Sequence, residues 1–252
     1  MELPTDPTQS WVFHPISGDL GITRFTHGLG VGDLNADGRL DVIEKNGWWE
    51  QPETKTTGDW KHHSVEFAKE GGAQMYAYDV DGDGDNDVIT SKHAHGYGLS
   101  WFENMSELNG VSFREHSIMG ERPEDNDYGI TFSKLHATEL ADVDGDGVKD
   151  IITGRRPSAP SNENADSPQP AVLYWFRTAR DGNRVRFIPY RIDLNSGVGT
   201  QVVAGDVNGD ELPDIVVGNK RGTFVFLHHA DTVDRETWQQ SQPKQLRGAD
   251  RE

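Results

Sequence analysis

Residues 78–90 read YDVDGDGDNDVIT, in which five aspartates between positions 79 and 87 run directly into a β-branched stretch. So many carboxylates in one short loop repel one another unless a cation lies between them. Oxygen atoms at alternate positions of a tight loop suit Ca2+, a hard cation that takes six to eight oxygen ligands. The stretch therefore predicts a cation-binding loop that leads directly into a strand.

The same loop occurs four times, beginning at residues 33, 79, 142 and 206. Each copy has Asp or Asn at its first, third, fifth and ninth positions, and a β-branched pair follows. The copies are DLNADGRLD (33–41), DVDGDGDND (79–87), DVDGDGVKD (142–150) and DVNGDELPD (206–214). A repeat of this size is typical of propeller blades, solenoid units or arrays.

Two further repeats flank these loops. One has an aromatic residue followed three positions later by His or Tyr, and it begins at Trp11, Trp60, Phe113 and Phe187. The other is an aromatic strand after each loop: GWWEQ (47–51), LSWFEN (99–104), LYWFRT (173–178) and TFVFLH (223–228). With the strands on either side of the loop, each unit has four short strands. The sequence predicts an all-β fold, a β-propeller of four-stranded antiparallel blades with four blades visible.

The propeller is expected to span residues 11–230. An N-terminal tail at 1–10 precedes it, and a C-terminal tail at 231–252 follows, with a short helix in DTVDRETWQQ (231–240). The stretch PSAPSNENADSPQP (157–170) predicts a mobile polar surface loop. Two alternatives exist for the ring: the strand from Trp11 to Ile16 completes the last blade, or the chain is the C-terminal part of a larger, seven-bladed propeller.

The chain has 252 residues, a net charge of −18 and no cysteine. Because nucleic-acid binding depends on Lys and Arg that neutralise phosphate, a nucleic-acid partner is not expected. No apolar run is long enough to insert into a membrane. The N-terminal stretch MELPTDPTQS has no features of a signal peptide, so the chain is either cytoplasmic or a mature or truncated secreted protein.

The ligands expected for Ca2+ come from positions 1, 3, 5, 7 and 9 of each loop, where position 7 gives its backbone carbonyl. Three to four sites are expected, and the fourth loop should be weakest because Glu211 replaces the glycine of position 6. The predicted metal ligands are Asp33, Asn35, Asp37, Arg39, Asp41, Asp79, Asp81, Asp83, Asp85, Asp87, Asp142, Asp144, Asp146, Val148, Asp150, Asp206, Asn208, Asp210, Leu212 and Asp214.

An EF-hand is the competing interpretation of these loops. DLNADGRLDVIE matches the EF-hand pattern, with Glu44 at position 12. The other three copies have Thr90, Thr153 and Val217 at that position, and their flanks read as strands. One match in four copies does not predict an EF-hand.

The D-x-[DN]-x-D-G-x-x-D loops with their β-branched pairs resemble FG-GAP/VCBS repeats, which occur in integrin-type and secreted bacterial propellers. The stretches THGLGVGDLNADGRLDVIEKNGWWEQP and GVGTQVVAGDVNGD are similar to bacterial VCBS propellers beside sugar-active domains. They are more distantly similar to the propellers of aldos-2-ulose dehydratase. The resemblance implies an extracellular or periplasmic, calcium-binding module. Its partners would be a carbohydrate, a protein, other propeller blades or a fused sugar-active domain.

The aspartate loops join first strands to second strands, so the starts of first strands and the second-to-third turns lie on the opposite face. That face collects His, Lys, Arg and Gln in an acidic chain, which suits an anionic or polyhydroxyl ligand. The alternative is that these are solvated loop residues. The ligand-binding candidates are Lys45, Gln74, Arg155, Arg156, Gln201, Lys220 and Arg221, and the catalytic candidates are His27, His93, His95 and His136.

Two kinds of chemistry suit these histidines. His93 and His95, with His27 or His136, have the residue types that hold Zn2+. Alternatively, a histidine base could remove a proton from a keto-sugar while Lys or Arg stabilises the enolate. The first interpretation is therefore a calcium-stabilised binding module for carbohydrate or protein, and the alternatives are a carbon–oxygen lyase on keto-sugars or a set of blades within a larger enzyme.

Overall fold

The computed structural model describes residues 6, 8, 13–21, 26–54, 60–106, 110–157, 169–182 and 184–246. Most of the predicted surface loop at 157–170 lies outside the described residues, as does Trp11. Within the described part the chain forms four antiparallel sheets and two short helices, which confirms the all-β prediction.

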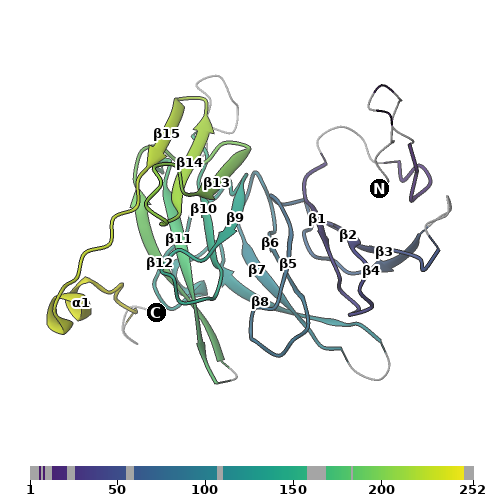
Figure 1. The fold of residues 1–252 in the computed structure, drawn as a ribbon, viewed down its shortest axis with the longest axis horizontal. Helices are drawn as coiled ribbons and strands as arrows, with labels where there is room; N and C mark the ends of the chain where they lie inside the picture. Colours follow the sequence, from purple (N-terminus) through teal and green to yellow (C-terminus); the bar gives the residue numbers. More distant parts are fainter. Residues whose placement is uncertain are drawn as a thin grey trace.

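The four sheets follow one another along the chain (Figure 1). The first contains β1 (Leu29–Gly32), β2 (Asp41–Glu44), β3 (Gly47–Glu50) and β4 (Lys61–Ser64). The second contains β5 (Tyr76–Tyr78), β6 (Asp87–Ser91), β7 (Leu99–Asn104) and β8 (Phe113–Met119). The third contains β9 (Thr138–Ala141), β10 (Asp150–Gly154), β11 (Leu173–Asp181) and β12 (Arg184–Asp193). The fourth contains β13 (Gln201–Gly205), β14 (Asp214–Asn219) and β15 (Gly222–Phe226). In each sheet the strands pair in chain order, as expected of blades.

The hydrophobic core lies between consecutive sheets. Because side chains alternate along a strand, Val88 of β6 packs toward the first sheet and its neighbour Ile89 packs toward the third. The same alternation holds in β10, where Ile151 packs with the second sheet and Ile152 with the fourth. Each inner sheet is therefore apolar on both faces, which explains the β-branched pair after each loop.

The outer strands are fixed by stacked aromatic pairs. His116 of β8 stacks on Trp101 with ring centroids 4.5 Å apart, and its Nε2 lies 2.6 Å from Glu103. The first sheet repeats this arrangement with Trp48, His63 and Glu50, and the third stacks Tyr190 on Trp175. The recurring aromatic motif therefore holds the outer strand of each of these sheets to the strand beside it.

A buried carboxylate anchors each aspartate loop to its sheet. The ninth residue of every loop is fully or almost fully buried and accepts two backbone N–H groups. One donor is the second residue of the loop and the other lies in the third strand or just beyond its end. For Asp41, Asp87, Asp150 and Asp214 the first donors are Leu34, Val80, Val143 and Val207, at 2.8–3.1 Å, and the second are Gln51, Asn104, Thr178 and His228, at 2.7–2.9 Å.

Burial perturbs these carboxylates differently along the chain. It raises the pKa of Asp87 and of Asp150 to about 7, because each lies between two other sheets. In the last sheet, hydrogen bonds from the backbone N–H groups of His228 and Val207 lower the pKa of Asp214, whereas burial raises the pKa of Asp41 in the first sheet. The sequence indicated only a metal ligand at the ninth residue of each loop. The structure shows that this residue also anchors the loop to its sheet.

Of the two alternatives for the ring, completion of the last blade by a strand from Trp11 to Ile16 is contradicted by the described residues 13–16. Residues 13–16 form no strand, and the carbonyl oxygen of Ile16 accepts a hydrogen bond from Trp60 N, at 2.9 Å, beside the first sheet. Pro15 cannot donate to a sheet ladder. In the described part of the chain the last sheet has three strands, and Figure 1 shows it at the opposite end of an open array from the first.

The C-terminal segment folds back over the third sheet. Helix α1 (Arg235–Ser241) begins after Asp234, whose side chain accepts the N–H of Thr237. Beyond it, Leu246 N donates to the carbonyl oxygen of Asp127, close to the 3-10 helix η1 (Pro123–Asp125). No helix in the described part of the chain is long and apolar enough to cross a membrane.

Replacing a buried loop aspartate should destabilise the fold strongly. Asp150→Ala leaves two buried N–H groups, of Val143 and Thr178, without acceptors, so we expect a loss of about 2–5 kcal/mol in the free energy of unfolding. Urea unfolding in the presence of a chelator measures this without a contribution from calcium. The control is Asp85→Ala in a neighbouring loop, which should change stability little. Equal losses for both variants would contradict a structural role for Asp150.

Candidate functional site

Three histidines from three sheets meet on the face opposite the aspartate loops. His27 precedes β1, His95 lies in the turn between β6 and β7, and His136 precedes β9. Their ring centroids are 4.8–5.2 Å apart, and one ring nitrogen from each lies within 4.8 Å of the others. The prediction that strand starts and second-to-third turns share one face is therefore confirmed for these three residues, which we call the histidine centre.

Close approach of the backbone brings the histidine centre together. Gly71 has φ of +82°, and a Cβ at this position would lie 2.5 Å from the carbonyl oxygen of His27. Gly71 also accepts a hydrogen bond from Ala94 N, which holds the turn that carries His95 against the start of the second sheet. Only glycine allows both contacts at a positive φ.

Arg156 and the histidines form a hydrogen-bonded chain. Arg156 Nη2 donates to Nδ1 of His95 at 2.9 Å, so Nδ1 is the acceptor of that ring and Nε2 carries its proton. Nε2 of His95 lies 3.2 Å from Nε2 of His27, which must then accept. The arginine thereby selects the tautomer of both rings.

The electrostatic environment of the centre is cationic. Burial, followed by the charge of Arg156, lowers the pKa of His27 and His95, and the same causes lower the pKa of His136 to about 4. Every charged group that lowers the pKa of these rings is a cation or another histidine. The three imidazoles are therefore neutral at pH 7 in surroundings that attract negative charge.

A hollow of about 310 Å³ opens beside the histidine centre. Its polar lining includes His27, His136, Thr26 and Gln74, and none of its lining residues is acidic. Gln74 accepts the N–H of Thr138 at 3.0 Å and donates to the carbonyl oxygen of Thr200 at 3.3 Å, which ties the second sheet to the third and to the start of the fourth. The hollow is large enough for a small ligand group such as one sugar ring.

The remaining ligand-site candidates do not join the histidine centre. Arg155 is 1% exposed and donates to the carbonyl oxygen of Gln169 within the third sheet. Arg221 bonds to Asn195 at the end of the fourth sheet, beside Lys220, and Gln201 begins β13 on an exposed position. Lys45 lies in the turn between β2 and β3, where its carbonyl oxygen accepts the N–H groups of Phe67 and Ala68.

His93 is also set apart from the centre. Its ring centroid is 6.4 Å from that of His95, and it is not among the nitrogen donors that converge with His27 and His136. The sequence pattern His93-x-His95 therefore does not identify the ligand pair.

Two of the three imidazoles lie at a distance that suits a shared zinc ion, and a nitrogen of the third lies within 4.8 Å of them. Two nitrogens bound to one tetrahedral Zn2+ at about 2.0–2.1 Å lie roughly 3.3 Å apart, close to the 3.2 Å between the Nε2 atoms of His27 and His95. A metal on Nε2 of His95 moves the ring proton to Nδ1, where it would face the N–H of Arg156. Zinc binding therefore requires Arg156 to turn away from His95.

The aspartate loops bring carboxylates together as expected of cation sites. In the second loop, oxygens of Asp79, Asp81 and Asp87 lie within 4.8 Å of one another, and burial raises the pKa of Asp81. In the third loop the group is Asp142, Asp144 and Asp146, and Arg177 of β11 forms ion pairs with the last two. A bound cation would have to compete with this arginine in the third loop but not in the second.

The fourth loop has the strain expected from its sequence. Glu211 adopts φ of +68°, at the position where the other loops have glycines with φ between +81° and +101°. A side chain in this left-handed region costs free energy that glycine avoids. The low calcium occupancy expected of this loop stays a prediction.

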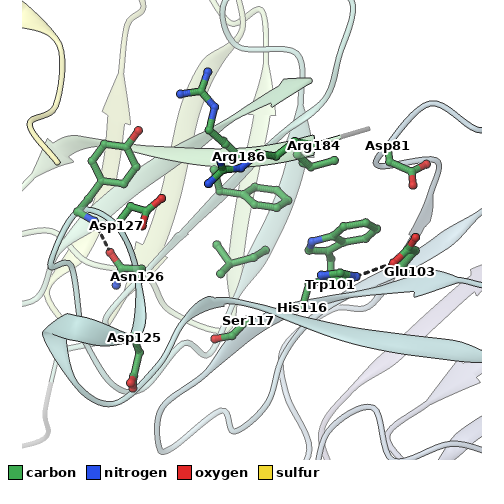
Figure 2. Close-up of a pocket in the computed structure, with 14 residues that line it drawn as sticks. Asp81, Trp101, Glu103, His116, Ser117, Asp125, Asn126, Asp127, Arg184 and Arg186 are labelled. Carbon is green, nitrogen blue, oxygen red and sulfur yellow. Dashed lines mark hydrogen bonds and ion pairs between the residues drawn. The ribbon is translucent and has the colours of Figure 1, made fainter. Parts of the chain in front are cut away.

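A second hollow, of about 410 Å³, lies between the outer strands of the second and third sheets (Figure 2). Glu103 and His116 line one side and Arg184 and Arg186 of β12 the other, while Asp125 pairs with Arg122 at 2.8 Å. None of the ligand-site candidates lines this hollow. The segment from the end of η1 onward, residues 125–128, lines the hollow together with the two outer strands.

Sequence reasoning missed Lys134. This residue is 4% exposed, has φ of +64°, and its backbone bonds to Gly96 and Arg156 at 2.6 and 3.2 Å. Its charge contributes to the lowered pKa of His95. No repeat includes this position, so no pattern in the sequence marks it.

Comparison with known families supports the repeat. Residues 142–217, which span the third and fourth aspartate loops, match the model of an FG-GAP-like repeat. No curated protein matches the chain at a significant level. The resemblance to FG-GAP/VCBS-type repeats is therefore confirmed, whereas the link to aldos-2-ulose dehydratase stays an expectation from sequence.

Acid should destabilise the protein through His136. The unfolded histidine has a pKa of about 6.5 and the folded one about 4, so between these values the unfolded chain binds more protons and stability falls as pH falls. We expect His136→Gln to remove up to about 3 kcal/mol of this loss between pH 7 and pH 4. Urea unfolding at a series of pH values, with metal removed, measures the difference. His229→Gln, at an exposed position, is the control and should leave the pH dependence unchanged.

Proposed function

We propose that this FG-GAP/VCBS-type repeat protein is an interaction module, stabilised by Ca2+ in its aspartate loops, that binds a carbohydrate or an acidic protein group through Zn2+ at the histidine centre. The observation that carries the proposal is the convergence of His27, His95 and His136 from three different sheets beside a hollow. Nδ1 of His136 is buried without a hydrogen-bond partner among the described residues, which costs free energy unless a ligand binds it.

The three rings would supply three nitrogen ligands and leave the fourth position of a tetrahedral ion open. A zinc ion held in this way offers a Lewis-acidic position to an oxygen of the ligand. Arg156, once turned from His95, would be free to donate to the same ligand. Gln74 holds the inner strands in place while the ligand enters.

The charge of the site narrows the class of ligand. No acidic side chain lines the hollow, and the cation Arg156 lowers the pKa of all three rings. A carboxylate or a sugar with adjacent hydroxyls supplies the oxygens that such surroundings prefer. An acidic sugar has both features, and we infer that it is the preferred ligand within the carbohydrate class.

The zinc site can be tested by calorimetry on calcium-loaded protein. We expect one zinc ion per chain, and His27→Ala and His136→Ala should each weaken its binding by at least about tenfold because a ligand is lost. The matched control is His93→Ala, which lies next to the centre but contributes no converging nitrogen. Equal weakening by all three substitutions, or no zinc binding by the wild type, would reject the site.

A second candidate function is a lyase that acts on keto-sugars. It is favoured by His136, whose low pKa keeps a neutral base beside the cationic Arg156. The imidazole would take a proton from the carbon beside the carbonyl while Arg156 stabilises the enolate oxygen. The carbon–oxygen bond at the next carbon then breaks, the hydroxyl leaves as water with a proton from an acid, and a conjugated enone forms.

An assay for enone formation distinguishes a lyase from a binding module. The enone absorbs in the ultraviolet, so we expect a rise in absorbance with 2-keto or 3-keto sugars if the protein is a lyase. His136→Ala should abolish this rise, and His93→Ala should preserve it. No rise with any sugar, together with zinc-dependent sugar binding, would leave the binding module as the function.

Calcium should stabilise the fold through the second loop more than through the fourth. Adding about 1 mM Ca2+ to chelated protein should raise the melting temperature by roughly 5–10 °C, as for a ligand near a hundred times its dissociation constant. Millimolar calcium is available outside cells, which fits an extracellular or periplasmic location.

The matched variants replace the third residue of each loop. Asp81→Ala should remove much of the calcium-dependent rise in melting temperature. Asn208→Ala, at the same position of the strained fourth loop, should remove little of it. A melting temperature that does not respond to calcium in the wild type would refute the proposal that these loops bind it.

A further inference from the structure

The two ends of the sheet array expose apolar faces. On the last sheet, Val203 and Val225 are 46% and 50% exposed, although both belong to strands. On the first sheet, Leu29 and Val31 of β1 are 66% and 62% exposed. Valine and leucine on regular strands normally pack against another layer, so both faces lack a partner layer within the described chain.

The exposed face of the last sheet repeats a face that is buried elsewhere. Val203, Val216 and Val225 lie opposite one another across β13, β14 and β15. The equivalent residues in the second sheet are Tyr76, Ile89 and Trp101, which pack against the third sheet. The last sheet therefore exposes the face that each earlier sheet packs against the next sheet in the chain.

The exposed face of the first sheet is equivalent to the face that each later sheet packs against the sheet before it. Val31, Val42 and Trp49 lie opposite one another across β1, β2 and β3. Their equivalents in the second sheet are Ala77, Val88 and Phe102, which pack against the first sheet. The two ends of the array therefore carry the two halves of one interface, which the chain already forms three times internally.

We propose that two copies of this chain associate head to tail, so that the last sheet of each packs on the first sheet of the other. The occupant of each end face is a second copy because this chain carries the complementary half on its other end. A two-fold axis relates the copies, and both contacts form at once. The result is a closed ring of eight sheets, within the range of known propellers.

The shape of the array leaves both end faces open to a second copy. The described chain is an open array with its first and last sheets at opposite ends (Figure 1), so neither end face covers the other within one copy. In the core between the second and third sheets, Trp101 of one sheet packs in the same cluster as Leu140 of the next. In the closed pair, Val225 of one copy corresponds to Trp101, and Val31 of the other copy corresponds to Leu140. The proposal is independent of any ligand at the histidine centre.

Sedimentation equilibrium on the calcium-loaded full chain tests the association. We expect a species of twice the 28.1 kDa chain mass at micromolar concentration. Val225→Asp and Val31→Asp should each weaken the association at least about tenfold, since both place a charge in an apolar contact. The control is Trp238→Asp on α1, a residue that is equally exposed at 49% but lies on neither end face.

A charge pair tests the head-to-tail arrangement directly. Val225→Asp and Val31→Lys copies should each remain monomeric alone, and an equimolar mixture should form a heterodimer. In that heterodimer Asp meets Lys at one contact and two valines meet at the other. Circular dichroism of each variant confirms folding, which is expected because both positions are exposed in the single chain.

Three results would overturn the proposal. The first is a wild-type chain that stays monomeric at every concentration. The second is a dimer that survives both aspartate substitutions. The third is open polymers that grow with concentration, which would show that the ends pair without closing a ring of two.

Discussion

The buried carboxylate at the end of each aspartate loop is the interaction on which the rest of the structure depends. Asp41, Asp87, Asp150 and Asp214 each connect the start of a loop to the third strand, or to the residues just after it, through two backbone N–H groups. Without an acceptor these donors would be buried and unpaired. The carboxylate therefore fixes the loop against the sheet whether or not a cation is bound, and it keeps the first, second and third strands in one register.

That register separates the two faces of the molecule. With the aspartate loops held on one face, strand starts and second-to-third turns lie on the other, where three sheets converge. His27, His95 and His136 come from three different repeats and meet only because the sheets stack. The hydrogen bond from Arg156 then sets the tautomers of His95 and His27, and Gly71 allows its own backbone to approach that of His27. The face built on regular repeats carries the aspartate loops, and the histidine centre lies on the face built on their irregular positions.

Sequence periodicity predicted the sheets and the face of the site because both follow from local rules. Alternation and β-branched pairs define strands, and the position of a residue relative to its loop defines its face. Among the ligand candidates, Gln74 and Arg156 lie at the centre, whereas Arg155 is buried in its own sheet. Arg155 and Arg156 are neighbours just after β10, yet one is buried and the other bonds to His95, a difference that pattern reasoning did not resolve.

By itself the sequence determined the four repeats, the strands within them, the aspartate loops and the strain at Glu211. Each of these depends on residues close together in the chain. Only the tertiary structure decided which histidines meet, that Lys134 belongs beside them, and that residues 13–16 do not pair with the last sheet. These outcomes depend on distances between sheets and on competing contacts such as that of Ile16 with Trp60, which no local pattern encodes.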